Sequence, residues 1–234
     1  MAENTDYDWV LEPLGGGATI DSGTLRTGDV VGDLEVSYTV TGTGTATYVV
    51  HSHPCFSAGA AAVASAEGEL LWYQRSGEPG FLEGTSYTED DTFLMLYRNT
   101  ILEFDWMGDT LMELSLGTDY DAGVHHDIMR ANGYTYVLHS DPVIHMGVAY
   151  TLDGVYVFDS DGVQVQDWRL YDHFQPPGPD PTVGMDYSHG NAVWVDAEGN
   201  MLVSFRHMST VVKVDGDPLS PNFGDVLWVL EGDP

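Results

Sequence analysis

The sequence contains very few basic residues. Lys213 is its sole lysine, and seven basic residues face 37 acidic ones, which gives a formal net charge of −30 over 234 residues. A protein with this charge repels polyphosphate and anionic bilayers, so we expect neither a nucleic-acid partner nor an acidic membrane partner. Such an acidic surface is typical of proteins from saline or marine settings, and it also serves ordinary solubility.

Cysteine and long hydrophobic runs are also scarce. Cys55 is the single cysteine, which excludes an intramolecular disulfide and a thiolate metal cluster, and we interpret it as a buried spectator. The longest aliphatic stretch, residues 60–64, is too short to span a bilayer, and the N-terminus lacks the basic and apolar regions of a signal peptide. We therefore expect no membrane span.

Tracts of helix-forming residues are few, whereas turn-forming residues are common. The chain has 27 glycines, 11 prolines and 13 tyrosines, a composition typical of short strands joined by tight turns. A unit of strand, turn, strand, turn, strand recurs over residues 89–116, 132–170 and 198–230. Each copy is what one blade of a β-propeller needs, so we predict an all-β fold with three to four blades.

Polar residues follow the predicted strands of residues 192–195 and 201–205. His189 and Asn191 lie at the start of the first strand, and Arg206 and His207 directly follow the second. Because strand side chains alternate between two faces, polar groups at strand ends can converge on one rim of a sheet. This rim is the candidate site.

Five short motifs resemble the bacterial arylsulfotransferases. They are Asp-x-x-His-x-Asn at residues 186–191, Ser-Phe-Arg-His at 204–207, Val-x-Lys-Val-Asp at 211–215, His-His-Asp at 125–127 and Asp-Trp-x-Leu-x-Asp-His at 167–173. The resemblance implies a six-bladed β-propeller preceded by a small β-sandwich, in a protein exported to the periplasm or the extracellular space. We accordingly divide the chain into an N-terminal β segment, residues 1–64, and a partial propeller, residues 65–234.

The same resemblance implies a reaction and roles for residues. In the family, sulfate moves from a phenolic sulfate ester to a phenol through a sulfated histidine, without a nucleotide donor or another cofactor. His126, His189 and Arg206 would be catalytic, binding and polarising the sulfate. The residues expected to bind the substrate around them are His125, Asn191 and His207.

The match is incomplete in one respect. The family's nucleophilic histidine lies in a Gln-His motif of a later blade, and His207 is the one imidazole that follows Arg206 here. The chain would then hold a sulfate-binding half of the site in an open arc of blades, and copies of it could associate to close the ring.

Other interpretations stay open at this point. A non-catalytic propeller that binds or scaffolds is the main alternative, in which His189 is structural and Arg206 braces a blade through a salt bridge. A metal-dependent hydrolase using His51, His53, His125 and His126 is a weaker one, because no spacing marks a closed ligand set, and we expect no metal site. The Asp-Ser-Asp-Gly of residues 159–162 lacks the downstream glutamate of a calcium loop, so we predict a β-turn there.

Some further residues receive structural predictions. The proline-rich loop of residues 173–187 is stiff and long enough to serve a site or a lid. His139 and His145 are predicted to be loop residues. Inter-blade packing is predicted for three tryptophans, Trp72, Trp168 and Trp228.

Overall fold

A computed structural model describes residues 6–13, 17–27, 41, 45–53, 59–76, 81–176, 178 and 186–232. The strands are β1 (Asp6–Leu11), β2 (Asp21–Arg26), β3 (Tyr48–His53), β4 (Ala60–Ser65), β5 (Leu70–Arg75), β6 (Leu82–Tyr87), β7 (Phe93–Tyr97), β8 (Thr100–Phe104), β9 (Thr110–Ser115), β10 (Val124–Ala131), β11 (Tyr134–His145), β12 (Val148–Phe158), β13 (Gln164–Arg169), β14 (Gly190–Val195), β15 (Met201–Phe205), β16 (Thr210–Val214) and β17 (Val226–Glu231). A short 3₁₀ helix, η2 (Leu170–Asp172), follows β13.

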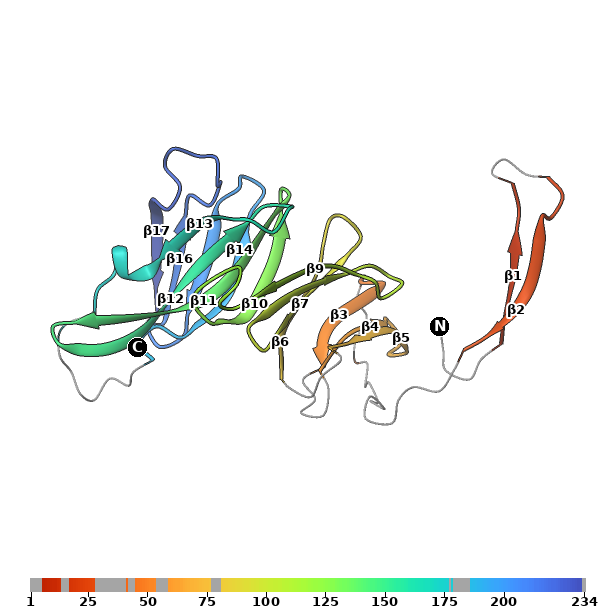
Figure 1. Cartoon of the computed structure of the whole chain (residues 1–234), viewed down its shortest axis with the longest axis horizontal. Helices are drawn as coiled ribbons and strands as arrows, with labels where there is room; N and C mark the ends of the chain where they lie inside the picture. Colours follow the sequence, from red (N-terminus) through yellow and green to blue (C-terminus); the bar gives the residue numbers. More distant parts are fainter. Residues whose placement is uncertain are drawn as a thin grey trace.

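The strands form antiparallel sheets that follow one another along the chain. Three sheets have four strands, in the orders β6-β7-β8-β9, β10-β11-β12-β13 and β14-β15-β16-β17, and a smaller sheet has the order β3-β4-β5. Figure 1 shows these sheets side by side in chain order, with the β1–β2 ribbon apart from them. We number these four blades one to four from β3–β5 onward. The arrangement confirms the predicted all-β, three-to-four-blade propeller.

The predicted repeat is one strand short of a complete blade. Its three strands correspond to the outer three strands of blades two, three and four, for example β15, β16 and β17. The innermost strand of each blade, which is β6, β10 or β14, precedes the repeat. Of these inner strands, the sequence predicted only part of β14, as the strand of residues 192–195.

Blades three and four share the largest described core. Val193, Val203 and Val212 lie opposite one another across β14, β15 and β16 and are at most 3% exposed. Trp168 of β13 belongs to the same core and donates its indole N–H to the Gly224 carbonyl, at 3.2 Å. Each buried side chain of this kind contributes about 1.5–3 kcal/mol, so this interface holds the two blades together.

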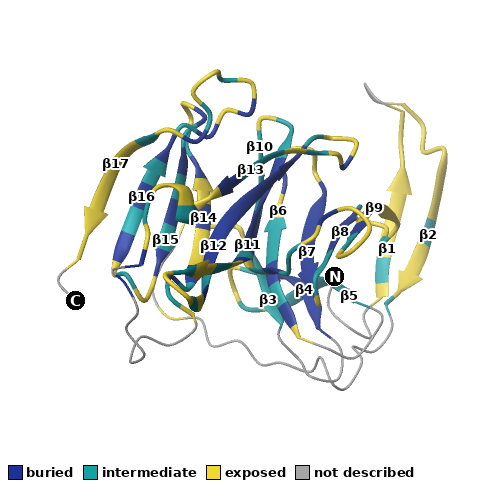
Figure 2. Ribbon diagram, turned by 60° about the vertical axis from the view of Figure 1, so that its left-hand side comes forward, coloured by how far each residue is buried: buried dark blue, intermediate teal, exposed yellow. Residues whose placement is uncertain are grey.

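The opposite face of blade four is exposed among the described residues. Trp194, Leu202, Lys213 and Trp228 form a row across its four strands, and Trp194 and Trp228 are 64% and 41% exposed. Figure 2 shows this exposure along β17. The prediction that Trp228 packs between blades is therefore wrong for the described part of the chain. Trp168 does pack there, and Trp72 stacks on Phe93 of blade two, with ring centroids 4.3 Å apart.

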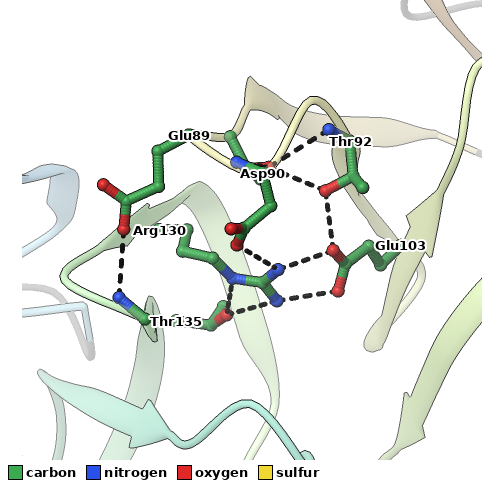
Figure 3. A network of polar contacts seen from close by, with 8 residues as sticks. Glu89, Asp90, Thr92, Glu103, Arg130 and Thr135 are labelled. Carbon is green, nitrogen blue, oxygen red and sulfur yellow. Dashed lines mark hydrogen bonds and ion pairs between the residues drawn. The ribbon is translucent and has the colours of Figure 1, made fainter.

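A buried ion pair joins blades two and three (Figure 3). Arg130 of β10 donates from both terminal nitrogens to the Glu103 carboxylate of β8, at 2.5 and 2.7 Å, and also contacts Thr135 and Asp90. Thr92 donates a further hydrogen bond to Glu103. Burial alone would raise the pKa of Glu103, but the hydrogen bonds from Arg130 and Thr92 outweigh it and lower the pKa. Because β10 also carries His125 and His126, this pair fixes the strand that presents them.

Aspartates close several of the tight turns between strands. In the turn of residues 159–162, one Asp159 oxygen accepts the backbone N–H groups of Asp161 and Val163, at 3.0 and 2.9 Å. Asp105 and Asp196 make the same pair of contacts in their own turns. The predicted β-turn at 159–162 is thus present, and turn closure uses part of the unusual aspartate content.

Residues 134–158 form one long hairpin, which includes His139 and His145, the two residues predicted to lie in a loop. β11 and β12 pair without interruption from Thr135 opposite Phe158 to His145 opposite Val148. His139 and His145 both belong to β11, and His139 is only 1% exposed, so the loop prediction for them is wrong. The Asp-Pro pair at residues 141–142 suggested a break, but extended backbone suits the residue before a proline equally well.

Several predicted features lie wholly or partly outside the residues that the structure describes. Cys55 and most of the proline-rich loop of residues 173–187 lie outside the described residues. β4 runs from residue 60 to 65, so the sheet of blade one takes strands from both sides of the predicted boundary at residue 64, and that division stays a prediction. No helix in the described ranges has the length and apolar character that a membrane crossing requires.

Candidate functional site

Four histidines meet where the inner strands of blades three and four begin. His125 and His126 lie near the start of β10, His189 directly precedes β14, and His207 follows β15. Consecutive rings are 5.0, 5.2 and 4.6 Å apart between centroids, in the order His125, His126, His189, His207. We call this set the histidine row, with His125 and His126 as its inner pair and His189 and His207 as its outer pair.

Backbone irregularities aim these rings toward one another. The pairing of β10 with β11 shifts between Val124 and Ile128, and that of β14 with β15 shifts between Gly190 and Ala192. His126 and His189 have φ values of 61° and 51°, which lie in the left-handed region. A non-glycine residue held in this region is strained, and such strain is often found at functional sites.

A buried carboxylate orients the inner pair. Asp153 of β12, whose side chain is 4% exposed, accepts from His125 Nε2 at 3.0 Å. His125 Nδ1 lies 2.9 Å from His126 Nδ1, so in the neutral rings His126 donates its Nδ1–H to His125. This chain leaves the lone pair of His126 on Nε2. The backbone N–H of His126 is also held, by the carboxylate of Glu83 in β6, at 2.9 Å.

An exposed carboxylate orients the outer pair. His189 Nδ1 hydrogen-bonds to Asp186 Oδ2, and His207 Nδ1 donates to the Asp186 backbone carbonyl, at 2.8 Å. The backbone links the same segments, because Arg206 N–H donates to His189 O and His207 N–H donates to Ser188 O, at 3.0 and 3.1 Å. The two histidine-bearing segments are therefore clamped together at several points.

Carboxylates from blade three also tie the two inner strands to each other. Asp127 accepts the backbone N–H of Val193, at 3.0 Å. Asp153 accepts the backbone N–H of Gly190 at 2.6 Å and the hydroxyl of Ser188. These contacts set the relative position of β10 and β14, so the distance between His126 and His189 follows from the blade interface and not from surface side chains alone.

Burial and hydrogen bonds alter proton affinities in the inner pair. Burial alone would raise the pKa of Asp153, but the hydrogen bonds from His125 and Ser188 outweigh it and hold the pKa below its ordinary value. Burial, with the neighbouring His125, lowers the pKa of His126. Asp153 is therefore a carboxylate and His126 a neutral imidazole at neutral pH.

Arg206 and Asn191 lie beside the row and are exposed. Arg206 is joined to His189 through its backbone N–H, and Asn191 is the second residue of β14. With the described residues, the Arg206 side chain makes no ion pair, so the blade-bracing salt bridge considered from sequence is not among the described contacts.

The family match covers this whole region. Residues 37–231 match the family model described as arylsulfotransferase (ASST). The chain belongs to the arylsulfotransferase family. All four histidines of the row, Asn191 and Arg206 lie within the matched residues of this arylsulfotransferase-family protein.

One solved structure shows the fold at low sequence identity, and a second is similar to a lesser degree. A protein of unknown function from Bacteroides caccae is 13% identical, with a TM-score of 0.52, and the match covers 80% of this chain and 58% of that one. Virginiamycin B lyase from Staphylococcus aureus is 11% identical, with a TM-score of 0.46 and coverages of 75% and 49%. The chain thus spans between half and three-fifths of the length of these two proteins. No curated protein sequence matches it.

Sequence reasoning about this arylsulfotransferase-family chain missed the supporting carboxylates. Glu83 and Asp153 lie in strands distant from the motifs, and neither stands in a pattern that marks it as part of a site. The one available signal was the high content of acidic residues. Any of these residues that become buried need specific hydrogen-bond or ion-pair partners. Asp186 was part of a recognised motif, but its bonds to both outer histidines were not predicted.

The other histidines lie outside the row. His51 and His53 are on β3 and, in the described part of the chain, belong to no group of three or more metal-ligating side chains. His139 Nε2 pairs with Asp167, at 2.9 Å, while its ring stacks on Tyr156. The ligand set considered for a hydrolase is therefore not assembled among the described residues.

Proposed function

We propose that this protein binds aryl sulfate esters at the histidine row and takes part in transferring their sulfate to a phenolic acceptor. The observation that carries the proposal is the close approach of His126 and His189, 5.2 Å between ring centroids, from the inner strands of adjoining blades. Family membership supplies the class of chemistry. His126, His189 and Arg206 are proposed to contact the sulfate. His125, Asn191 and His207 are proposed to bind the substrate around them.

The row has the donors that a sulfate group requires. Sulfuryl transfer resembles phosphoryl transfer in needing hydrogen-bond donors and positive charge on the peripheral oxygens of the group. Arg206 offers a planar guanidinium suited to two of those oxygens, and an imidazole of the outer pair can donate through Nε2 when it is protonated. In a chain of net charge −30, an arginine without an ion-pair partner among the described residues supplies the positive charge that binding of an anion requires.

A non-catalytic binding role is the second candidate. His207, which directly follows Arg206, is the histidine that this candidate treats as structural. The Nδ1 of His207 already donates to the Asp186 carbonyl, which suits an orienting role. Binding of aryl sulfates without turnover would favour this candidate.

The remaining partners follow from family analogy and stay proposals. We place the protein in the periplasm or outside the cell, with aryl sulfates and phenols as its small-molecule partners and no cofactor for the transfer itself. Association of copies to close the ring is a further proposal, and the exposed face of blade four around Trp194 is a surface where it could occur.

The test uses 4-nitrophenyl sulfate with the full chain. We expect calorimetry to show binding that Arg206→Ala weakens by tenfold or more, about 1.4 kcal/mol, because the substitution removes a charge-assisted donor pair. Arg26→Ala is the matched control, since Arg26 pairs with Asp6 in the separate β1–β2 ribbon. Release of nitrophenolate on adding phenol identifies transfer. No binding, or equal losses in both variants, contradicts the proposal.

A further inference from the structure

Three side chains at the exposed end of the histidine row form a compact set of potential metal ligands. Asp186, His189 and His207 each offer a ligand atom within 4.8 Å of the other two. Within the described residues, this is the one group of three or more histidine, cysteine or acidic side chains gathered so closely. The sequence did not predict it, because the motif spacing alone does not bring His207 to Asp186.

The ligand atoms face one another. His189 Nδ1 is hydrogen-bonded to Asp186 Oδ2, and His207 Nδ1 lies 3.9 Å from the same oxygen. His207 Nδ1 donates to the Asp186 backbone carbonyl, at 2.8 Å, so an ion bound by this nitrogen would replace that hydrogen bond. Tetrahedral zinc bound at about 2.0–2.2 Å keeps its ligand atoms roughly 3.3 Å apart. Small rotations of exposed side chains would therefore complete the coordination.

The backbone beneath the three ligands is already fixed. The Tyr187 N–H donates to the Thr151 carbonyl at 2.8 Å, which holds the segment containing Asp186 against β12. The contacts of Ser188 and His189 with residues 206–207 hold the second segment. A site whose backbone is ordered before the ion arrives loses little conformational entropy on binding.

The surroundings admit a hydrated cation. The side chains of His189, His207 and Asp186 are 23%, 43% and 48% exposed, so an ion can reach them from solvent. The net charge of −30 raises the local concentration of cations. Two imidazoles and one carboxylate are a donor set that favours zinc, cobalt or nickel over calcium and magnesium, which prefer oxygen ligands alone.

We propose that Asp186, His189 and His207 bind a divalent transition-metal ion of the zinc class. The ion takes the place of the Nδ1 protons on both imidazoles. Three protein ligands leave at least one coordination position open to water or to an oxygen of a small anion. The Nε2 atom of His189 stays on the side away from the ion. Metal binding would therefore use Nδ1 of this ring, and sulfate binding would use Nε2.

Zinc titration of the full chain tests this site. Protein treated with EDTA and then desalted is titrated with Zn²⁺ by calorimetry, without any aryl sulfate. We expect one equivalent to bind, and Asp186→Asn and His207→Ala to weaken the affinity by at least tenfold each. His145→Ala is the matched control, because His145 lies at the end of β11 and contacts Tyr171 instead.

Two further readings make the result decisive. Co²⁺ in place of Zn²⁺ should give visible absorption bands in the wild type that are lost in His207→Ala, while excess Ca²⁺ should not displace Zn²⁺. The proposal is overturned if no stoichiometric binding occurs, or if Asp186→Asn and His207→Ala bind as the wild type does, or if His145→Ala weakens binding equally. Because aryl sulfate is absent throughout, the outcome leaves the proposed function untouched.

Discussion

The inner and outer pairs of the histidine row are built alike, but the carboxylates that hold them are buried to different extents. In each pair a carboxylate holds an imidazole, through Asp153 for His125 and through Asp186 for His189. The Asp153 side chain is 4% exposed, whereas that of Asp186 is 48% exposed. The difference shows that the same arrangement of carboxylate and imidazole occurs in two environments, because Asp153 lies within the blade interface and Asp186 is open to solvent.

Burial explains why the carboxylate of the inner pair has more fixed partners than that of the outer pair. A buried carboxylate without partners is very unfavourable, so its oxygens must be matched by fixed donors. Asp153 meets this requirement with His125, Ser188 and the Gly190 backbone, which come from two blades. Asp186 can use water for any oxygen that loses a protein partner, so its contacts can be exchanged at little cost.

Removing the two carboxylates should give the largest difference between the pairs. Asp153→Ala leaves His125, Ser188 and Gly190 without their acceptor, so we expect the free energy of unfolding to fall by about 3 kcal/mol or more. Asp186→Ala should lower it by less than about 1 kcal/mol, because the lost contacts are exposed. Urea unfolding of both variants measures the contrast, and equal losses would show that burial does not separate the pairs.

Replacing one histidine from each pair should give a smaller difference. Asparagine tolerates the left-handed backbone at both positions, so His126→Asn and His189→Asn remove the ring without adding backbone strain. We expect both to weaken 4-nitrophenyl sulfate binding by about tenfold, roughly 1.4 kcal/mol. His126→Asn should in addition destabilise the protein by about 1 kcal/mol, because it ends the hydrogen-bond chain from Asp153.

Calorimetric affinity and urea unfolding, measured on the same samples, distinguish these two expectations. A stability loss in His189→Asn as large as that in His126→Asn would mean that both pairs are structural. Unchanged binding in both variants would remove the row from the proposed site.

The fold could be predicted further than the site. Turn signals such as the Asp-Gly pairs, together with alternating strands, predicted three repeats, and these repeats correspond to β7–β9, β11–β13 and β15–β17. Of the inner strands, β14 was predicted in part, as the strand of residues 192–195. β6 and β10 are not among the strands that the repeat predicted.

For the site, the family motifs predicted the candidate residues but not the carboxylates that position them. His126, His189 and Arg206 were named from motifs, yet their mutual distances depend on Asp127, which bonds across blades to Val193. No sequence pattern links residues 127 and 193, because their contact is a product of blade packing. The same holds for Glu83 and the backbone of His126.

A pH dependence should give the smallest difference. The pKa of His126 is lowered by burial and by His125, so it lies below the ordinary value of about 6.5. A lowered pKa in the folded state contributes stability above about pH 6.5 and loses it as the pH falls through the folded value. The wild type should therefore lose more stability than His126→Asn between pH 7 and pH 5, by a small amount because His126 is exposed to solvent. Urea unfolding at several pH values checks this, and parallel curves for the two proteins would contradict it.

Imidazole ¹⁵N nuclear magnetic resonance during titration with 4-nitrophenyl sulfate tests most directly whether the row is one binding site. If it is, the ring nitrogens of His126, His189 and His207 should shift together along a single saturation curve, and Arg206→Ala should weaken all three responses by the same factor. The rings of His139 and His145 should not respond. Separate curves for His126 and His189, or shifts no larger than those of His145, would contradict the account.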